Sequence, residues 1–196
     1  MKQQISKPEA VSLISFVGPV GSGKDFEAQK YLEKGYVQIG MADLVREIVW
    51  KQIGWFPKNL AQYEAFKTTI FIGARTESYL GHFTGRDLLN GLTNEIIKVN
   101  PDFWFEEWSK KVKLALAEGK NVVLTDMRYE SSVKYLLDIA SAEVNCKIIF
   151  CNYKSEKYSL QEGLTEKMIG GILNELGDIP HFTDITSYFE ERFSKE

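Results

Sequence analysis

The chain has 196 residues, of which 44% are apolar and 26% are charged, and its formal net charge at pH 7 is −3. This length and balance are typical of a globular domain with a sizeable core. The net charge provides no electrostatic surface for duplex nucleic acid or for an anionic membrane, although local loops and arginines can still bind small anions. No apolar run approaches ~18 residues, so the sequence predicts no membrane-spanning helix.

The N-terminal residues and the two cysteines predict a cytoplasmic location. The opening stretch MKQQISKPEA is polar and leads directly into an apolar run, which is not the pattern of a signal peptide. Cys146 and Cys151 would lie about 5 × 3.3 Å apart on an extended strand, too far for a local disulfide. We expect both to be reduced core thiols. His82 and His181 are too distant in sequence to suggest a metal site.

Strands alternate with helices at both ends of the sequence. The predicted strands are, in chain order, 11–17, 36–40, 121–126, 146–151 and a short one near 181–185. The helices that accompany them are predicted over 24–35, 131–142, 160–176 and 187–193. This alternation predicts an α/β fold with a parallel sheet of about five strands and helices on both faces.

Residues 41–118 have helical spacing between two of these strands. Four helices are predicted there, over 42–52, 60–80, 85–99 and 102–119. The segment is too long for a simple crossover, so we expect a helical substrate-binding lobe on a core made of residues 11–40 and 119–196. No repeat or Pro/Gly/Ser-rich linker divides the chain, which favours a single domain over residues 1–196.

The loop after the first strand has the spacing of a phosphate-binding loop. Residues 18–25 read GPVGSGKD and fit the pattern G-x-x-x-x-G-K between a strand and a helix. Glycines let backbone N–H groups converge on phosphate oxygens, and the helix directs its positive end at them. Lys24 would reach the β and γ phosphates. The expected nucleotide-binding residues are Gly18, Val20, Gly21, Ser22, Gly23, Lys24 and Asp25; the alternative is a chance glycine-rich turn.

Asp25 stands where this pattern normally has Ser or Thr, whose hydroxyl contacts magnesium. A carboxylate is tolerated electrostatically in the first turn of a helix and can hold Mg²⁺, directly or through water. Asp25 is therefore the predicted metal ligand, with a capping role as the alternative. Phe26, which follows it, has no role in this interpretation.

Asp126 and Arg128 follow another predicted strand and form the second candidate group. The carboxyl ends of parallel strands meet at one edge of a sheet, where ligands bind. Asp126 could hold a magnesium-bound water or contact substrate, and Arg128 could neutralise charge on the transferring phosphoryl group. Together with Lys24 they are the predicted catalytic residues. Alternatively, Asp126 caps the helix that follows and Arg128 is simply solvated.

The candidate substrate-binding residues of the lobe lie on two predicted helices. Arg86 and Asn90 are four residues apart and share one helix face, with Glu95 further along. Arg86 suits an anionic phosphate, and Asn90 offers a donor and an acceptor to a nucleobase edge. Trp104 lies in the aromatic run DFWFEEW, which could stack on a base. The alternative for Arg86, Asn90 and Glu95 is an ordinary polar helix face, and the alternative for Trp104 is a position in the core.

These blocks resemble the phage-type deoxynucleoside monophosphate kinases, a branch of the P-loop nucleotide kinases. In that family the phosphate loop typically reads G-x-x-x-S-G-K-D, as residues 18–25 do here. A helix close to R-x-L-L-Q-x-x-G-T-E followed by P-D-x-W corresponds to RDLLNGLTNE at 86–95 and PDFW at 101–104. A strand ending in T/P-D-x-R corresponds to LTDMR at 124–128. The three blocks follow the family's order and span about half of the chain.

The resemblance implies a P-loop kinase fold that uses ATP and Mg²⁺ to phosphorylate a dNMP. It implies that Lys24 and its loop bind the donor, that Arg86 and Arg128 contact phosphates, and that Asn90 stands near the acceptor base. Asn90 replaces the family's Gln with a shorter side chain, so the base preference stays open. Phe26 replaces the usual Thr after Asp25 and removes a hydroxyl that could have served the metal. ATP and a dNMP are the expected partners; stable nucleic acid and membrane are not, and a homodimer stays open.

Two other functions fit the same residues. The chain could be a P-loop kinase of another small metabolite or of a modified base in DNA. It could also be a catalytically inactive nucleotide-binding module, an interpretation that Asp25 and Phe26 motivate.

Overall fold

The computed structural model describes residues 10–19, 21–76, 79–127, 129–140, 144–152, 164–177 and 180–195. The chain divides into two compact units. The first contains Met1–Gly40 and Ser109–Glu196, and the second contains Met41–Trp108. The second unit is thus an insertion in the sequence of the first.

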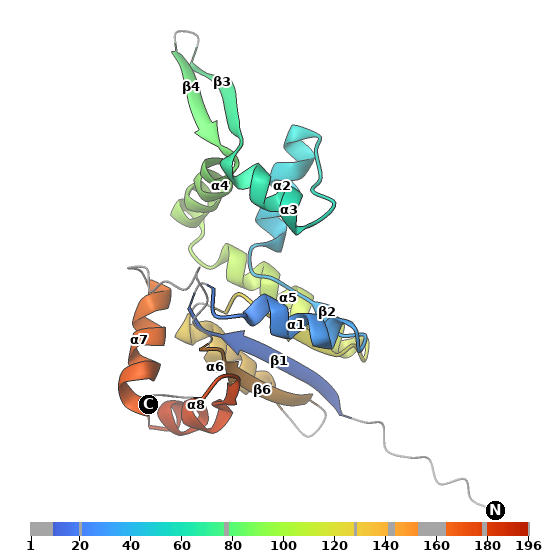
Figure 1. The fold of residues 1–196 in the computed structure, drawn as a ribbon, viewed down its shortest axis with the longest axis vertical. Coiled ribbons are helices and arrows are strands. Elements are labelled where there is room, and N and C mark those ends of the chain that lie inside the picture. Colours follow the sequence, from blue (N-terminus) through green and yellow to red (C-terminus); the bar gives the residue numbers. More distant parts are fainter. Residues whose placement is uncertain are drawn as a thin grey trace, which may run out of the picture. The chain divides into compact units, whose positions relative to one another are not determined.

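A five-stranded sheet forms the centre of the first unit (Figure 1), and its strands lie in the order β2-β5-β1-β6-β7. Its strands are β1 (Val11–Val17), β2 (Val37–Gln38), β5 (Val122–Leu124), β6 (Val144–Phe150) and β7 (Thr183–Asp184). The first four pair in parallel, whereas β7 runs antiparallel to β6. The predicted α/β class is therefore confirmed, but the prediction of a parallel sheet is wrong for β7. A strand of two residues carries no sequence pattern that indicates its direction.

Helices cover both faces of this sheet, as predicted. They are α1 (Lys24–Leu32), α6 (Glu130–Ile139), α7 (Leu164–Leu176), α8 (Thr186–Phe193) and the end of α5 (Phe103–Ala117). Ile14 and Phe16 of β1 pack against Ala28 of α1. The alternating residues Leu13 and Val17 are fully buried on the opposite face. The connection from β1 to β2 runs along the sheet in one direction, and the connection from β5 to β6 runs in the opposite direction. Because such crossovers are right-handed, α1 and α6 lie on opposite faces of the sheet (Figure 1).

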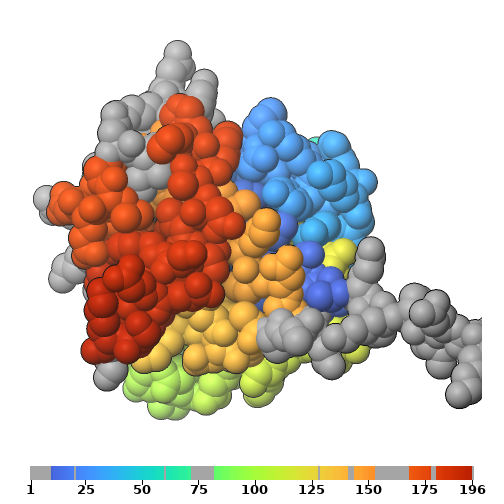
Figure 2. All heavy atoms as spheres, turned by 90° about the horizontal axis from the view of Figure 1, so that it is seen from below, coloured from blue at the N-terminus to red at the C-terminus, as the bar shows by residue number. Residues whose placement is uncertain are grey.

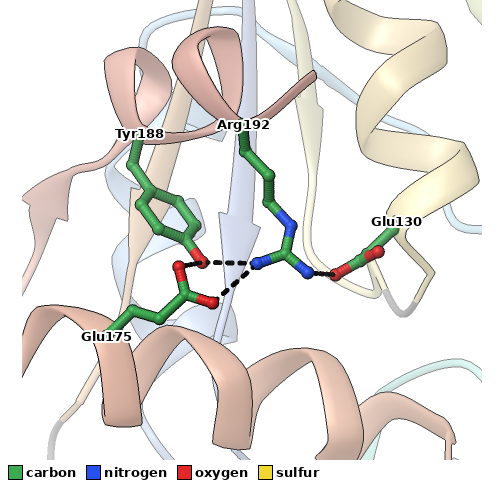
Figure 3. A network of polar contacts seen from close by, with 4 residues as sticks. All are labelled: Glu130, Glu175, Tyr188 and Arg192. Atoms are coloured by element: carbon green, nitrogen blue, oxygen red, sulfur yellow. Dashed lines mark hydrogen bonds and ion pairs between the residues drawn. The ribbon is translucent and has the colours of Figure 1, made fainter. Parts of the chain in front are cut away.

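A polar network joins the three C-terminal helices of the first unit (Figure 3). Arg192 of α8 donates hydrogen bonds to Glu175 of α7 (2.8 Å), to the Tyr188 hydroxyl (3.2 Å) and to Glu130 of α6 (2.9 Å). The Tyr188 hydroxyl donates to the other oxygen of Glu175 (2.9 Å). One guanidinium thereby links helices from three segments, and Figure 2 shows α7 and α8, coloured orange to red, gathered on one face of this unit.

The second unit combines helices with a β-hairpin. Its helices are α2 (Asp43–Ile53), α3 (Leu60–Thr68), α4 (Gly85–Val99) and the start of α5, and its core contains Val45, Val49, Phe66 and Leu89. The hairpin consists of β3 (Ile70–Thr76) and β4 (Tyr79–Thr84), which pair antiparallel. The prediction of a helix over 60–80 is therefore wrong beyond Thr68, and the insertion is not entirely helical.

Local chemistry explains where α3 ends. The hydroxyls of Thr68 and Thr69 donate to the Ala65 carbonyl, at 3.1 and 2.8 Å, and the backbone of Thr69 is already extended. The β-branched and aromatic residues that follow favour a strand. Phe71 stacks on Phe83 across the hairpin, with ring centroids 6.2 Å apart and planes 13° apart. Within the part of the chain that the structure describes, no helix combines the length and apolar character needed to cross a membrane.

Candidate phosphate-binding site

The loop between β1 and α1 lies at the carboxyl end of the central strand. After β1 the chain passes to β2 on one side of the sheet, and after β6 it passes to β7 on the other side. The neighbouring strands β1 and β6 therefore flank a topological switch point. Ligands of open α/β sheets bind in the crevice at such a point. Gly18, Gly21 and Gly23 have φ angles of 154°, 76° and 85°, which residues with side chains rarely adopt. Val20 lies outside the described residues.

The start of this loop rests on the end of β6. The Cys151 N–H donates to the Val17 carbonyl (2.7 Å), so the backbone after β6 continues alongside β1. A Cβ atom on Gly18 would lie 2.2 Å from the Cys151 carbonyl oxygen and 2.8 Å from the Ser22 hydroxyl. Ser22 is itself fully buried, so neither neighbour can easily move away. Glycine at position 18 is therefore required by packing as well as by its φ angle.

Lys24 folds back over the same loop. Its ammonium donates to the carbonyls of Gly18 (2.7 Å) and Pro19 (2.5 Å), and the Ser22 hydroxyl is 3.4 Å away. The N-cap of α1 is Gly23, which has no side chain to cap the helix, and the Glu27 N–H makes the first helical bond to its carbonyl (2.9 Å). The positive end of α1 and an ammonium thus lie at one loop, an arrangement that favours a bound anion.

Both cysteines are free thiols, as predicted, and Cys151 lies beneath the loop. Burial raises the pKa of the Cys151 thiol to about 12, against a smaller opposing effect of the Lys24 ammonium. Burial likewise raises the pKa of Cys146 to about 12. Both side chains are therefore neutral packing groups near neutral pH.

Asp25 and Asp126 are the carboxylates that the sequence predicted near the loop. Asp25 is exposed in the first turn of α1, and Asp126 is half-buried just after β5. The described residues contain no group of three His, Cys, Asp or Glu side chains that could hold a metal ion. Magnesium commonly binds through one or two carboxylates together with substrate phosphates. A magnesium ion here would thus depend on the nucleotide for its other ligands.

The structure brings Asp126 to the same edge of the sheet as the phosphate loop. β5 and β1 pair in parallel with Leu124 opposite Ser15, so both chains leave the sheet at that edge. Gln38, the last residue of β2, donates to the Thr125 hydroxyl (2.9 Å) and holds the end of β5 there. The N-cap position of α6 is occupied by Tyr129, so Asp126 does not take the capping position. Arg128 lies outside the described residues.

The other candidate residues belong to the second unit. Arg86, Asn90 and Glu95 are exposed on α4, and Glu95 forms an ion pair with Lys98 (2.6 Å). Trp104 is half-buried against the core of this unit, and its indole N–H donates to the Thr93 carbonyl (3.2 Å). These contacts favour the core interpretation of Trp104. Arg86 and Asn90 remain available on the surface for a ligand.

The second unit also contains a pocket that the sequence did not predict. It has a volume of about 460 Å³, and Trp55 stacks on Phe66 in its wall with ring centroids 5.6 Å apart. The pocket is lined by Ile53, Trp55, Gln62, Ala65, Phe66, Thr69 and Phe71. Its walls come from two helices and the following strand, and the sequence offers no motif that joins them.

The first unit therefore has a glycine-rich loop and a lysine at the start of a helix, at the carboxyl edge of a mostly parallel sheet. This arrangement suits an anion that presents several oxygens. Comparison of the sequence with protein-family models and with curated proteins found no significant match. The functional conclusion consequently depends on the geometry of the loop and on the sequence blocks that accompany it.

Proposed function

We propose that this chain is a cytoplasmic P-loop kinase of the deoxynucleoside monophosphate type, which transfers the γ-phosphoryl group of ATP to a dNMP. The observation that carries the proposal is the position of the Lys24 ammonium, which lies 2.7 Å from the Gly18 carbonyl at the positive end of α1. The resemblance of residues 18–25, 86–104 and 124–128 to that family supports it. The mostly parallel α/β sheet is compatible with it.

The residues of the chain would act by positioning and by neutralising charge, which is most of what phosphoryl transfer requires. Lys24 would exchange its hydrogen bonds to loop carbonyls for bonds to the β and γ phosphates. Arg86 and Arg128 would hold phosphate oxygens of the acceptor and of the transferred group, and Asn90 would face the acceptor base. Magnesium would neutralise charge on the phosphates, and Asp25 and Asp126 are the carboxylates that would hold it.

No dedicated general base is required for this reaction. The second ionisation of a phosphate monoester lies near pH 6, so the acceptor oxygen is already deprotonated near neutral pH. Closure of the lobe over the acceptor would exclude water and limit hydrolysis of ATP.

The test is a product assay with ATP, magnesium and each common dNMP, including hydroxymethylated pyrimidines. We expect formation of a dNDP from at least one of them. Lys24→Ala should abolish product while the circular dichroism spectrum and the melting temperature stay close to those of the wild type. Lys34→Ala removes an exposed ammonium from the other end of the α1 segment and should leave turnover unchanged.

Three outcomes would overturn the proposal. No turnover with any dNMP, but turnover with another metabolite, would indicate a different small-molecule kinase. Phosphorylation of oligonucleotides that carry modified bases would indicate a DNA-modifying kinase. Binding of ATP with no product in the presence of magnesium would indicate a nucleotide-binding module.

A further inference from the structure

Phe26, which has no role in the phosphate loop, is the most exposed aromatic side chain near it. It follows Asp25 in the first turn of α1, and 75% of its surface is accessible to solvent. Its helix neighbour Ala28, in contrast, is buried against the sheet. The Phe26 ring therefore contributes little to the core of the first unit. A single exposed apolar side chain is common on protein surfaces, so the significance of Phe26 depends on what lies beside it.

Phe182 lies close to the same part of α1. It precedes β7, and Thr183 pairs with Phe150, so Phe182 stands at the edge of the sheet where β6 ends. The Lys30 ammonium is 5.9 Å from the ring centroid of Phe26 and 5.9 Å from that of Phe182. Two exposed aromatic rings thus share one ammonium within two turns of Lys24.

The backbone of Phe182 is strained in a way that holds its ring at this edge. Phe182 has a φ angle of 59°, and it is the single non-glycine residue with a positive φ in the described part of the chain. Residues with large side chains rarely adopt this conformation, and the examples that occur cluster at functional sites. The Thr183 hydroxyl donates to the Pro180 carbonyl (2.8 Å) and closes the turn that contains the strain.

The charges around the two rings favour a base and not a further phosphate. Glu27 forms an ion pair with Lys30 (2.6 Å), so the ammonium between the rings is already neutralised by a carboxylate. Apolar rings with a paired ammonium suit a planar heterocycle, which offers π faces for stacking and electronegative atoms at its edge.

We propose that Phe26, Phe182 and Lys30 form the stacking site for the nucleobase of the donor nucleotide. The inference rests on the proposed function, because it takes the phosphates of that nucleotide to lie at Lys24. The occupant follows from continuity, since Phe26 stands two residues after Lys24 and on the same helical turn. Stacking tolerates different bases because every base has a π face. The site therefore predicts that ATP and GTP bind with similar affinity.

The test compares binding of ATP with binding of inorganic tripolyphosphate, measured by isothermal titration calorimetry. Phe26→Ala and Phe182→Ala should each weaken ATP binding at least fivefold, the lower end of what base stacking contributes. Both variants should bind tripolyphosphate within twofold of the wild type, because this ligand has no base. Phe26→Trp should retain ATP affinity, because it keeps an aromatic face. Lys24→Ala should weaken both ligands.

Phe56→Ala is the matched control, since Phe56 is an exposed aromatic residue of the second unit and should leave both affinities unchanged. Phe26 is exposed, so its replacement should not prevent folding even if the Phe182 variant does. Wild-type ATP affinity in Phe26→Ala would overturn the inference, as would an equal loss for ATP and tripolyphosphate. A change of oligomeric state without loss of ATP affinity would also overturn it and identify a protein interface.

The failure of this inference is distinguishable from that of the proposed function. Phe26-dependent ATP binding without formation of any dNDP would support the stacking site and overturn the kinase assignment. Formation of dNDP by the wild type, together with unchanged ATP affinity in Phe26→Ala, would support the kinase assignment and overturn the stacking site. A wild-type protein that binds neither ATP nor tripolyphosphate would overturn both.

Discussion

Replacement of Gly18 by alanine tests the contact beneath the phosphate loop. The added Cβ would lie 2.2 Å from the Cys151 carbonyl oxygen, where real Cβ atoms are essentially never found. The Cys151 backbone cannot withdraw without breaking its hydrogen bond to the Val17 carbonyl (2.7 Å). The φ angle of 154° adds backbone strain for any residue with a side chain. The loop must therefore shift or the sheet edge must open.

The magnitude follows from these two costs. Overpacking of a filled site costs about 1–3 kcal/mol, and a sparsely populated backbone conformation costs about another 1–3 kcal/mol. We therefore expect Gly18→Ala to lower the free energy of unfolding by about 2–6 kcal/mol. At ~2–4 °C per kcal/mol for a chain of this size, the melting temperature should fall by about 4–24 °C. Tripolyphosphate binding should weaken as well, because the loop is displaced.

The assay is urea unfolding followed by circular dichroism, with Gly119→Ala as the matched control. Gly119 has a φ angle of 73°, but its added Cβ would meet no atom within 4 Å. That variant reports the backbone cost alone, whereas Gly18→Ala reports the backbone cost and the collision together. If Gly18→Ala is no more destabilised than Gly119→Ala, the Cys151 carbonyl does not lie beneath the loop and the packing argument is wrong.

Three further predictions concern other parts of the structure. Hydrogen bonds from Thr84 lower the pKa of Asp87 from 3.8, so their stabilisation of α4 is present above that pH and is lost on acidification. Urea unfolding at pH 7 should thus distinguish Asp87→Asn from the wild type, and the difference should shrink as the pH falls below 3.8; a constant difference would contradict this. Burial raises the pKa of Cys146 and Cys151 to about 12, from 9.0, so stability should fall as the pH rises above 9. The buried Cys151 thiol should not react with Ellman's reagent in the native protein at pH 8, and rapid labelling of Cys151 would contradict its burial. Arg192→Ala should lower the free energy of unfolding by about 1 kcal/mol or less for each exposed ion pair that is lost; Arg192→Lys should restore only part of it, because an ammonium lacks the planar fork, and full restoration would contradict this.

The parts of the fold that could be predicted from sequence depend on short-range patterns. The apolar run at 11–17 became β1, and the glycines of the loop that follows lie where the φ angle is positive. The strands predicted at 121–126 and 146–151 became β5 and β6. In each case the residues that decide the conformation are neighbours in the chain.

The parts that could not be predicted depend on residues far apart in the chain. The helical spacing of 60–80 continues through β3, but the stacking of Phe71 on Phe83 favours the hairpin. The left-handed backbone of Phe182 has no signal in the residues around it, because the turn is closed by tertiary pairing with β6. The same holds for the approach of Phe182 to Lys30, which joins the two ends of the first unit.

The contact between Gly18 and Cys151 has a consequence for how relatives of this chain can diverge. The loop rests on the carbonyl oxygen of Cys151 and not on its thiol, and every amino acid provides that carbonyl. Another small apolar residue could replace Cys151 without disturbing the loop, whereas position 18 accepts glycine alone. One partner is therefore invariant and the other is free to change, so the pair produces no correlated substitutions. A restraint between two distant segments would leave only an unchanging glycine in an alignment of related sequences.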